Sequence, residues 1–373
     1  MKIVHVAPFY HPVIGGVEEV VKRAAEYMAG RAHEVYVVTY NRLRNGGFGS
    51  LPREEEINSV RVIRLRPDFT WSHGTYSGEL PGVIRRLKPD VVHVHVWRHP
   101  HVFQVAKLKG ELGFRAILHS HAPFHRLSQL GVVTWLYHRA VDATGRGTLE
   151  RYDAVVALTP QERDILIRKL SVDEDKVVVI PNGIGDDFLK AAVEYNGHKD
   201  MNMVLYLGRI SKSKNIDLLI KATRYLDRGI RVVLAGPDEG LIGRLLDMAK
   251  RYGAKVEYKG TVGEREKVKL YGEAGVYVNP AHYEPFGITL LEAQALGTPC
   301  IVTGDGGQIY VAPPGRTSLY AKPNPRDIAE KIMQILTDQE LHRRLSESAK
   351  EWAAQHEWSK ILPKYEELYT KVA

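Results

Sequence analysis

Two glutamates eight positions apart, Glu284 and Glu292, are the side chains of this sequence best placed to do chemistry. Residues 276–278 and 299–302 are short apolar runs, and residues 287–296 between them have apolar positions at helical spacing, which predicts a strand, helix and strand of a parallel sheet. Glu284 then lies in a loop at the sheet edge where ligands bind. Glu292 lies in an apolar helix, where a buried carboxylate needs hydrogen-bond donors. Sugar hydroxyls would be suitable donors.

The same loop offers a place for a phosphate group. Backbone N–H groups near Gly287, Ile288 and Thr289 open the predicted helix, so they lack intrahelical partners and carry the positive end of the helix dipole. An anion can dock there without a charged side chain. Taken singly, each glutamate also fits an ordinary exposed carboxylate. The motif as a whole favours a binding site.

The run EPFGITLLEA at 284–293, with LGTP at 296–299 and the pair Gly306 and Gly307, resembles the nucleotide-sugar motif of the retaining glycosyltransferases of family 4. This resemblance implies the GT-B fold, an α/β architecture of two Rossmann-like, doubly wound domains facing across a cleft. It implies that the first glutamate faces the donor sugar and that the second holds the ribose hydroxyls. The donor-binding residues implied by this stretch are Phe286, Gly287, Ile288, Thr289, Glu292, Gly306 and Gly307.

Composition is that of a two-domain globular protein. The 373 residues are enough for two cores, and 44% hydrophobic residues exclude disorder as the main state. The single cysteine, Cys300, excludes an internal disulfide and a cysteine-rich zinc site. No stretch reaches the roughly 18 apolar residues of a membrane span, and the N-terminus resembles a first strand rather than a signal peptide. We expect a cytoplasmic protein.

Positive charge is concentrated in the first half of the chain. Residues 1–182 carry 25 Lys and Arg against 19 Asp and Glu, whereas residues 183–373 carry 27 against 25. Such an excess can steer an anionic acceptor, a phospholipid surface or a nucleic acid. No run of four basic residues and no nucleic-acid motif is present, so we expect no nucleic-acid partner.

The chain starts with a strand at 2–8, followed by Gly15, Gly16 and a helix. A double glycine at a helix N-terminus suits a phosphate, and the resemblance implies that this one contacts the donor diphosphate. Alternating strands and helices continue to residue 181 and predict a doubly wound domain. The predicted parts are an acceptor-side domain at 1–183, a linker at 184–201, a nucleotide-sugar-binding domain at 202–350 and a C-terminal helix at 351–373 that crosses back to the first domain.

Histidines are dense between residues 93 and 125. His93 and His95 alternate on a predicted strand and share a face, which makes a zinc site conceivable. No carboxylate accompanies them at ligand spacing, so we predict no metal site. Asp173 and Asp175, the one Asp-x-Asp pair, precede a predicted strand instead of ending one. We therefore predict no divalent-metal requirement.

His121 ends the predicted strand RAILHSH at the ligand edge. A histidine there can hydrogen-bond a sugar hydroxyl or stabilise a departing diphosphate. The resemblance implies the same position close to the donor sugar, so His121 and Glu284 are the predicted catalytic residues. His95 is assigned to the acceptor side.

Two cations follow the first strand of the second domain. Arg209 comes directly after the apolar run 203–208 and Lys214 follows five residues later, a spacing that suits a diphosphate and that family 4 enzymes share. Asn215 stands where the family usually has glycine. Val262 lies in a turn that resembles the loop whose backbone reads the nucleobase, which leaves the base open.

Residues 124–151 mix apolar and basic side chains. Such a segment lies in a membrane interface or, the interpretation we favour, packs on the protein core. With a lipid-linked acceptor, this segment would make a peripheral contact with the inner face of the membrane.

Together these features predict a retaining, metal-independent glycosyltransferase of the hexosyltransferase type that needs no cofactor. It would move a sugar from a nucleotide-sugar donor to a glycan, lipid-linked or small-molecule acceptor. A double displacement needs a carboxylate nucleophile, and no carboxylate of the first domain clearly supplies one. We therefore favour attack by the acceptor on the same face of the sugar from which the leaving group departs. The alternatives are a non-catalytic nucleotide-sugar-binding protein and a sugar-nucleotide epimerase of the same architecture.

Overall fold

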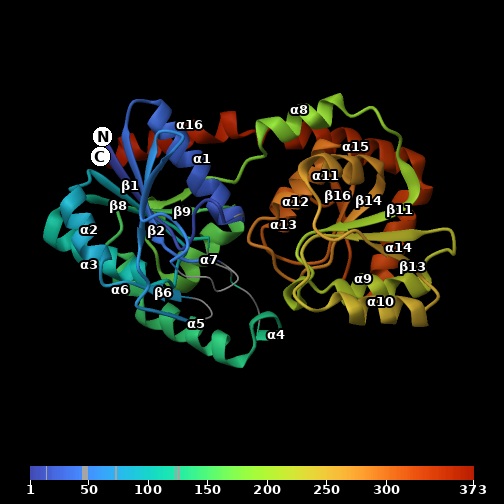
Figure 1. Ribbon diagram of the computed structural model, residues 1–373. Helices are drawn as coiled ribbons and strands as arrows, with labels where there is room; N and C mark the ends of the chain where they lie inside the picture. The colour runs from blue at the N-terminus through green and yellow to red at the C-terminus, as the bar shows by residue number, and fades with distance from the viewer. Residues whose placement is uncertain (14, 44–48, 72–73, 122–123, 125–126) are drawn as a thin grey trace. The chain divides into compact units, whose positions relative to one another are not determined.

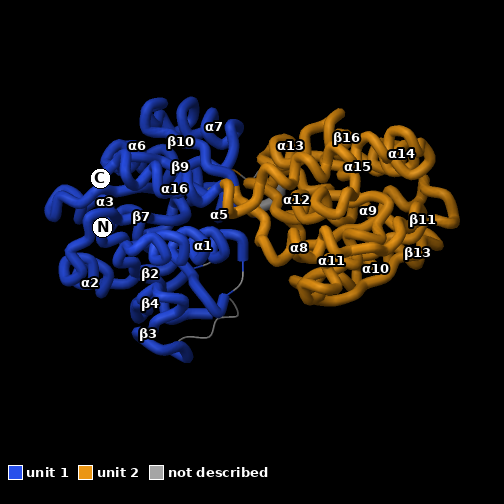
Figure 2. The backbone as a smooth tube through the Cα atoms, turned by 90° about the horizontal axis from the view of Figure 1, so that it is seen from above, with its two compact units in different colours: residues 1–123, 131–181, 361–373 blue, residues 124–130, 182–360 orange. Residues whose placement is uncertain are grey.

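The computed structural model describes residues 1–373 except 14, 44–48, 72–73, 122–123 and 125–126. The chain forms two compact units, coloured separately in Figure 2. Unit 1 comprises residues 1–123, 131–181 and 361–373, and unit 2 comprises residues 124–130 and 182–360. Among the described residues, no helix is both long enough and apolar enough to cross a membrane.

Residues 1–181 of the chain, drawn from blue to green in Figure 1, contain the strands of unit 1. Most of these strands form an eight-stranded sheet with the order β10-β9-β8-β7-β1-β2-β4-β3. Every neighbouring pair is parallel except β3 with β4. Its strands are β1 (Lys2–Val6), β2 (Glu34–Tyr40), β3 (Glu54–Ile57), β4 (Val60–Leu65), β7 (Val91–His95), β8 (Arg115–His119), β9 (Ala154–Ala157) and β10 (Val177–Val179), with a separate hairpin of β5 (Phe69–Trp71) and β6 (Gly74–Tyr76). The central strands are buried along most of their length, as expected of a parallel sheet covered on both faces.

Most helices of unit 1 connect these strands as crossovers, whereas α16 (Trp358–Val372) is the last element of the chain. The helices of this unit are α1 (Gly16–Gly30), α2 (Leu80–Leu87), α3 (Pro100–Leu112), α5 (Val132–Thr144), α6 (Arg146–Leu149), α7 (Pro160–Leu170), the 3-10 turn η1 (Glu174–Lys176) and most of α16. The N-termini of α3 and α7 are set by proline in the first turn, and Thr159 caps α7 by accepting from the Glu162 N–H.

Unit 2 contains a six-stranded, wholly parallel sheet with the order β13-β12-β11-β14-β15-β16. Its strands are β11 (Asp200–Leu207), β12 (Arg231–Ala235), β13 (Lys255–Tyr258), β14 (Ala274–Asn279), β15 (Cys300–Val302) and β16 (Ser318–Tyr320). Its helices are α4 (Leu127–Leu130), α8 (Asp186–Glu194), η2 (Lys212–Lys214), α9 (Ile216–Ala222), η3 (Thr223–Tyr225), α10 (Ile242–Arg251), α11 (Glu264–Glu273), α12 (Ile288–Ala295), α13 (Gln308–Val311), α14 (Pro325–Thr337) and α15 (Gln339–Ala354). The strand order reverses between β11 and β14, which is where open sheets of this kind bind ligands.

The predicted pair of doubly wound domains is confirmed, and the predicted strand, helix and strand around the two glutamates are β14, α12 and β15. The predicted linker at 184–201 is wrong. It contains α8 and the first residues of β11, and α8 packs on α11 and α12 through the buried Phe188. The crossing helix also begins later than predicted, since α15 belongs to unit 2 and residues 361–373 of α16 belong to unit 1.

The core-facing interpretation of residues 124–151 is also wrong for most of α5. This helix exposes Val132, Val133 and Leu136 by 62%, 83% and 54%, and His138 is its one buried residue. Apolar spacing alone does not say which face of a helix is covered, so the periodicity of this segment was compatible with both environments.

Candidate functional site

The loops after β11, β12 and β13 are held together by close backbone contacts. Gly236 has a positive φ of 126°, and a Cβ atom there would lie 2.1 Å from the carbonyl oxygen of Gly208. The Gly236 N–H donates to the Gly260 carbonyl at 2.7 Å, so the turn containing Val262 is tied to the same group of loops. The absence of a side chain at Gly236 thus lets the loop after β12 lie directly against the predicted diphosphate loop after β11.

Lys214 and Glu284 form an ion pair at the reversal point of the sheet. The Lys214 Nζ lies 2.7 Å from Oε1 and 2.5 Å from Oε2 of Glu284, and the two side chains are only 18% and 16% exposed. Lys214 ends η2 after β11, and Glu284 follows β14, so adjacent strands bring together residues 70 positions apart. Asn215 takes the left-handed conformation at φ 52°, which asparagine tolerates better than most residues. The turn is therefore made without the glycine usual in the family.

Arg209 is more exposed than Lys214. It pairs with Glu239 at 2.9 Å, and the two side chains are 57% and 50% exposed. An exposed pair of this kind contributes about 0–1 kcal/mol. Arg209 can therefore exchange this carboxylate for a phosphate group at little cost.

The N-terminus of α12 follows Glu284 closely in the sequence, and the hydroxyl of a buried tyrosine holds it in place. Gly287 precedes the helix with φ 101°, a conformation that favours glycine. The Tyr277 hydroxyl lies 2.8 Å from Thr289 Oγ1 and 3.0 Å from the Leu207 carbonyl oxygen. Burial raises the pKa of Tyr277 well above its usual value, so the hydroxyl stays neutral. Tyr277 thus links the start of α12 to the end of β11.

Gly306 and Gly307 pack directly on the backbone of the glutamate loop. A Cβ at Gly306 would lie 2.5 Å from the Glu284 carbonyl oxygen, and one at Gly307 would lie 2.1 Å from that of Pro285. The Gly307 N–H also donates to the Glu284 carbonyl at 2.7 Å. These glycines support the loop that carries Glu284, a structural role in addition to the donor binding that the resemblance implies for them.

Glu292 has protein donors on both oxygens. Its Oε1 accepts from Lys267 Nζ at 2.7 Å and its Oε2 accepts from the Tyr271 hydroxyl at 2.9 Å, and the residue is 8% exposed. Burial opposes the charge of Lys267, but Glu292 and Glu264 outweigh it and raise the pKa of the lysine. Sequence reasoning missed this pair, although Lys267 and Tyr271 stand four positions apart on α11 and so share a helix face. Each carboxylate oxygen can accept one more bond, for example from a hydroxyl.

Two further side chains support the loop. Phe286, a predicted donor-binding residue, is buried and 3% exposed. Gln308, which sequence reasoning missed, is fully buried and donates from Nε2 to the Ala281 carbonyl at 2.9 Å. Both lie on the segments that follow β14 and β15. Their contribution is to hold the loop of Glu284 in place.

In unit 1, Gly15 and Gly16 lie at the start of α1 as predicted. Gly15 has extended backbone at φ 175°, and Gly16 begins the helix. Glu18 and Glu19 occupy the first turn, and Glu18 is 4% exposed. Negative charge is thus already present at this helix N-terminus, unlike the N-terminus of α12, which has no acidic residue in its first turn.

His121 follows β8 and is held by other histidines. It has φ 40°, is 6% exposed, and its Nε2 lies 3.2 Å from His95 Nδ1. Burial lowers the pKa of His121 to about 3, so the ring is a neutral hydrogen-bonding group at neutral pH. His95, predicted on the acceptor side, is fully buried and contacts the ring of His121, so its side chain is not exposed for a direct contact with an acceptor.

Two sets of histidines in unit 1 bring ring nitrogens within 4.8 Å of one another: His5, His93 and His95, and His95, His119 and His121. The His119 and His121 rings are stacked at 3.7 Å and 19°. A metal ion in the plane of one stacked ring lies out of the plane of the other, where no nitrogen lone pair points. For the set of His95, His119 and His121, this geometry suits ring stacking better than a shared metal ion.

The Asp-x-Asp pair has a structural position. Asp173 caps η1 by accepting from the Asp175 N–H at 3.1 Å. An N-terminal cap accounts for the first aspartate without a ligand.

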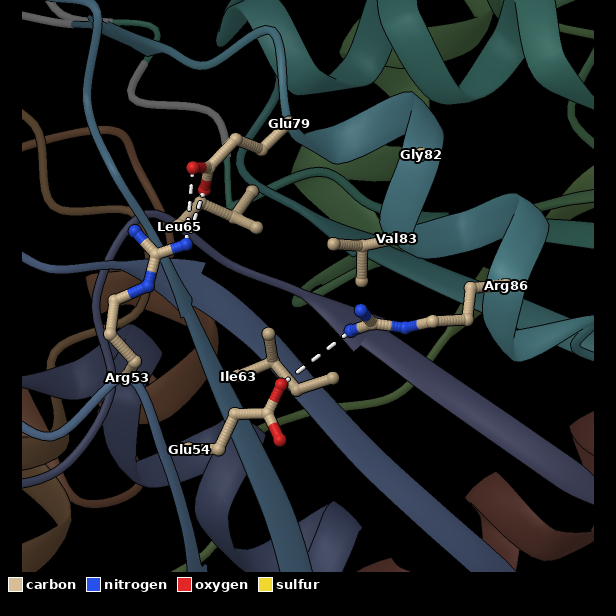
Figure 3. Close-up of a pocket in the computed structure, with 8 residues that line it drawn as sticks. All are labelled: Arg53, Glu54, Ile63, Leu65, Glu79, Gly82, Val83 and Arg86. Atoms are coloured by element: carbon tan, nitrogen blue, oxygen red, sulfur yellow. Dashed lines mark hydrogen bonds and ion pairs between the residues drawn. The ribbon is translucent and has the colours of Figure 1, made fainter.

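A pocket of about 310 Å³ lies elsewhere in unit 1, between β3, β4 and α2 (Figure 3). Its charged residues point toward one another: Arg53 pairs with Glu79 at 2.9 Å and Arg86 with Glu54 at 3.5 Å. Strands β7, β1 and β2 separate β4 from β8, so this pocket is distinct from the site of His121.

Comparisons with known proteins give a consistent result. The family model described as Glycosyl transferases group 1 matches residues 190–352, and that of Glycosyltransferase Family 4 matches residues 14–188. An uncharacterized glycosyltransferase of Methanocaldococcus jannaschii is 30% identical over 91% of this chain and 90% of its own length. Sucrose-phosphate synthase from Thermosynechococcus elongatus has a similar fold, with a TM-score of 0.81, 22% identity and 99% and 98% of the two chains covered. So does Anabaena HepE in complex with UDP and glucose, with a TM-score of 0.77, 16% identity and full coverage of both chains.

Proposed function

We propose that this chain, which belongs to the group 1 and family 4 glycosyltransferases and has the GT-B fold, transfers a sugar from a nucleotide-sugar donor with retention of anomeric configuration. The observation that carries this proposal is the half-buried pair of Lys214 and Glu284 beside the N-terminus of α12, at the point where the strand order of unit 2 reverses. The site offers positive charge, open N–H groups and a fixed carboxylate.

Donor binding is proposed for unit 2. The diphosphate would lie against Arg209, Lys214 and the first turn of α12, whose combined positive potential stabilises the charge that builds up on the leaving nucleoside diphosphate. Glu292 would accept hydrogen bonds from the ribose, and backbone groups near Val262 would contact the base. The HepE structure with UDP supports a nucleotide of this type, because its fold matches the whole of this chain.

Lys214 and Glu284 have complementary parts in this reaction. With no ligand, each neutralises the other. A bound diphosphate would compete for the lysine, and Glu284 would then accept hydrogen bonds from the sugar hydroxyls. Arg209 and Lys214 are proposed to take the place of a divalent metal ion, so transfer should proceed in the presence of a metal chelator. Retention is proposed to follow from same-face attack, in which an oxygen of the leaving phosphate takes the proton of the acceptor hydroxyl.

The acceptor is proposed to be a carbohydrate or a lipid-linked sugar. The exposed Val132, Val133 and Leu136 on α5 support a peripheral contact with a membrane, because apolar side chains of an interfacial helix insert at the headgroup boundary.

The test is a transfer assay with UDP-, GDP- and ADP-sugars in the presence of EDTA. The assay measures the nucleoside diphosphate that is released, and NMR of the anomeric signal gives the configuration of the product. We expect one donor to react without metal and to keep its anomeric configuration. Lys214→Met should abolish turnover, whereas Lys212→Met, a matched change at the exposed start of η2, should not. An inverted product, or equal activity in the two variants, would contradict the proposal.

A further inference from the structure

A hydrogen-bonded chain of side chains runs behind His121 through unit 1. His121 Nε2 lies 3.2 Å from His95 Nδ1, and His95 Nε2 lies 3.1 Å from His5 Nδ1. His5 Nε2 lies 3.5 Å from the hydroxyl of Tyr369 on α16, and the same hydroxyl lies 2.6 Å from His93 Nδ1. The chain thus joins the residue after β8 to the C-terminal helix by way of β7 and β1.

Three imidazole rings link Tyr369 to the outer end of this chain, which is His121, and each of them is neutral: His5, His95 and His121. Burial lowers the pKa of His5 and of His121 to about 3, and burial together with neighbouring histidines lowers the pKa of His95 well below its usual value. A neutral imidazole donates from one ring nitrogen and accepts at the other. Each contact uses one hydrogen atom, so the tautomer of one ring fixes the tautomer of the next.

The two contacts of the Tyr369 hydroxyl set the direction of the chain. A separation of 2.6 Å is short for an N–H donor and closer to the range of an O–H donor, so the hydroxyl donates to His93 Nδ1 and its oxygen accepts from His5 Nε2–H at 3.5 Å. This assignment places the hydrogen of His93 on Nε2, which has no hydrogen-bond partner among the described residues. His5 Nδ1 then accepts from His95 Nε2–H, and His95 Nδ1 accepts from His121 Nε2–H. Nδ1 of His121 is left with its lone pair at the outer end.

We propose that Tyr369 is a positioning residue that holds His121 in the Nε2–H tautomer, so that its Nδ1 accepts a hydrogen bond from a substrate hydroxyl. The use of His121 in transfer rests on the proposed function, whereas the coupling of the tautomers does not. Without the Tyr369 hydroxyl, His5 Nε2–H becomes a buried donor that has lost its acceptor, which is costly. Reversing every bond of the chain removes that donor and turns His121 Nδ1 into an N–H group.

Tyr365 provides a matched control on the same helix. It is fully buried, and its ring lies 6.1 Å from those of His93 and His119, centroid to centroid. Within the described part of the chain, its hydroxyl has no hydrogen-bond partner. Tyr365→Phe and Tyr369→Phe therefore remove the same atom from neighbouring turns, but only Tyr369→Phe breaks the chain.

The experiment uses the full-length protein with ¹⁵N-labelled histidine rings. Long-range ¹H–¹⁵N spectra report which ring nitrogen carries the hydrogen, and the signals lost in His121→Gln identify His121. We expect Nε2–H in the wild type and in Tyr365→Phe, and Nδ1–H in Tyr369→Phe. In the transfer assay, Tyr369→Phe alone should lower kcat by about tenfold, roughly the effect of one hydrogen bond, with an unchanged KM for the donor.

One tautomer in all three proteins, or a change in both tyrosine variants, would overturn the coupling. A tautomer change in Tyr369→Phe with an unchanged kcat would overturn the positioning role. If Tyr369→Phe does not fold, His5→Leu removes the next link and should give the same tautomer change. A wild type that transfers no sugar would count against the proposed function, while the spectra would still decide the coupling.

Discussion

Removing one partner of the Lys214–Glu284 pair should destabilise the protein, and removing both should restore most of the loss. The pair is formed at 2.5–2.7 Å by side chains that are 18% and 16% exposed. Either Lys214→Met or Glu284→Gln leaves a charge in a half-buried place with no counter-charge. The double variant leaves neither charge.

The expected magnitude follows from the burial of the two side chains. Breaking a fully buried ion pair costs about 3–5 kcal/mol. The remaining exposure lets water screen the orphaned charge, so we expect each single variant to lose about 2 kcal/mol of unfolding free energy. The double variant should lie within about 1 kcal/mol of the wild type, giving a coupling of at least about 3 kcal/mol between the two residues.

The assay is urea denaturation of the wild type, both single variants and the double variant, with sugar transfer measured on the same samples. Stability should return in the double variant and activity should not, because the site would then lack both the cation and the carboxylate. Additive changes in stability would refute the ion pair. A double variant that transfers sugar at near the wild-type rate would refute the site.

Three further predictions follow from buried positions. Gly236→Ala places a Cβ against the Gly208 carbonyl oxygen and should lower the unfolding free energy, measured by urea denaturation, by about 2–4 kcal/mol. An unchanged midpoint of the urea denaturation curve would contradict the close approach of these loops. His119→Leu should raise the unfolding free energy by about 1 kcal/mol in the same measurement, because both buried ring nitrogens lack hydrogen-bond partners among the described residues. A lower unfolding free energy would show that the histidine ring makes stabilising contacts that leucine cannot replace. Burial lowers the pKa of His5 and of His121 from 6.5 to about 3, so below pH 6.5 the unfolded chain binds protons that the folded chain does not. The melting temperature should therefore be highest above pH 6.5 and should fall as the pH drops toward 3. A melting temperature that does not change with pH would exclude neutral buried histidines.

The sequence predicted those parts of the site that depend on short-range pattern. The strand before Glu284 and the helix that carries Glu292 are visible as local apolar runs, and the order of strands and helices predicts the doubly wound fold. Lys214 and Arg209 were found because two cations follow directly after an apolar strand. These features need no knowledge of which distant segments meet.

Contacts between distant segments could not be read in this way. The pairing of Lys214 with Glu284 depends on β11 and β14 becoming neighbours, although 70 positions separate the two residues. Likewise, Lys267 reaches Glu292 only because α11 packs on α12. The chain from His121 to Tyr369 requires the last helix to lie against the first sheet. Such contacts are properties of the packed fold and leave no local signal.

Two errors had local causes. The short helix α8 was taken for a linker because it spans only nine residues and is flanked by polar segments, so its period was weak. Residues 132–136 were assigned to the core because apolar side chains at helical spacing are usually covered. Neither error touches the residues of the donor site.

The most direct test of the account is the thermal unfolding of the wild type and of Lys214→Met with UDP-, GDP- and ADP-sugars in EDTA. A ligand that binds only the folded protein stabilises it by about 2.7 kcal/mol at a hundredfold excess over Kd. We predict that one nucleotide-sugar raises the melting temperature of the wild type and leaves that of Lys214→Met unchanged. No rise with any donor, or an equal rise in both proteins, would contradict a donor site at Lys214 and Glu284.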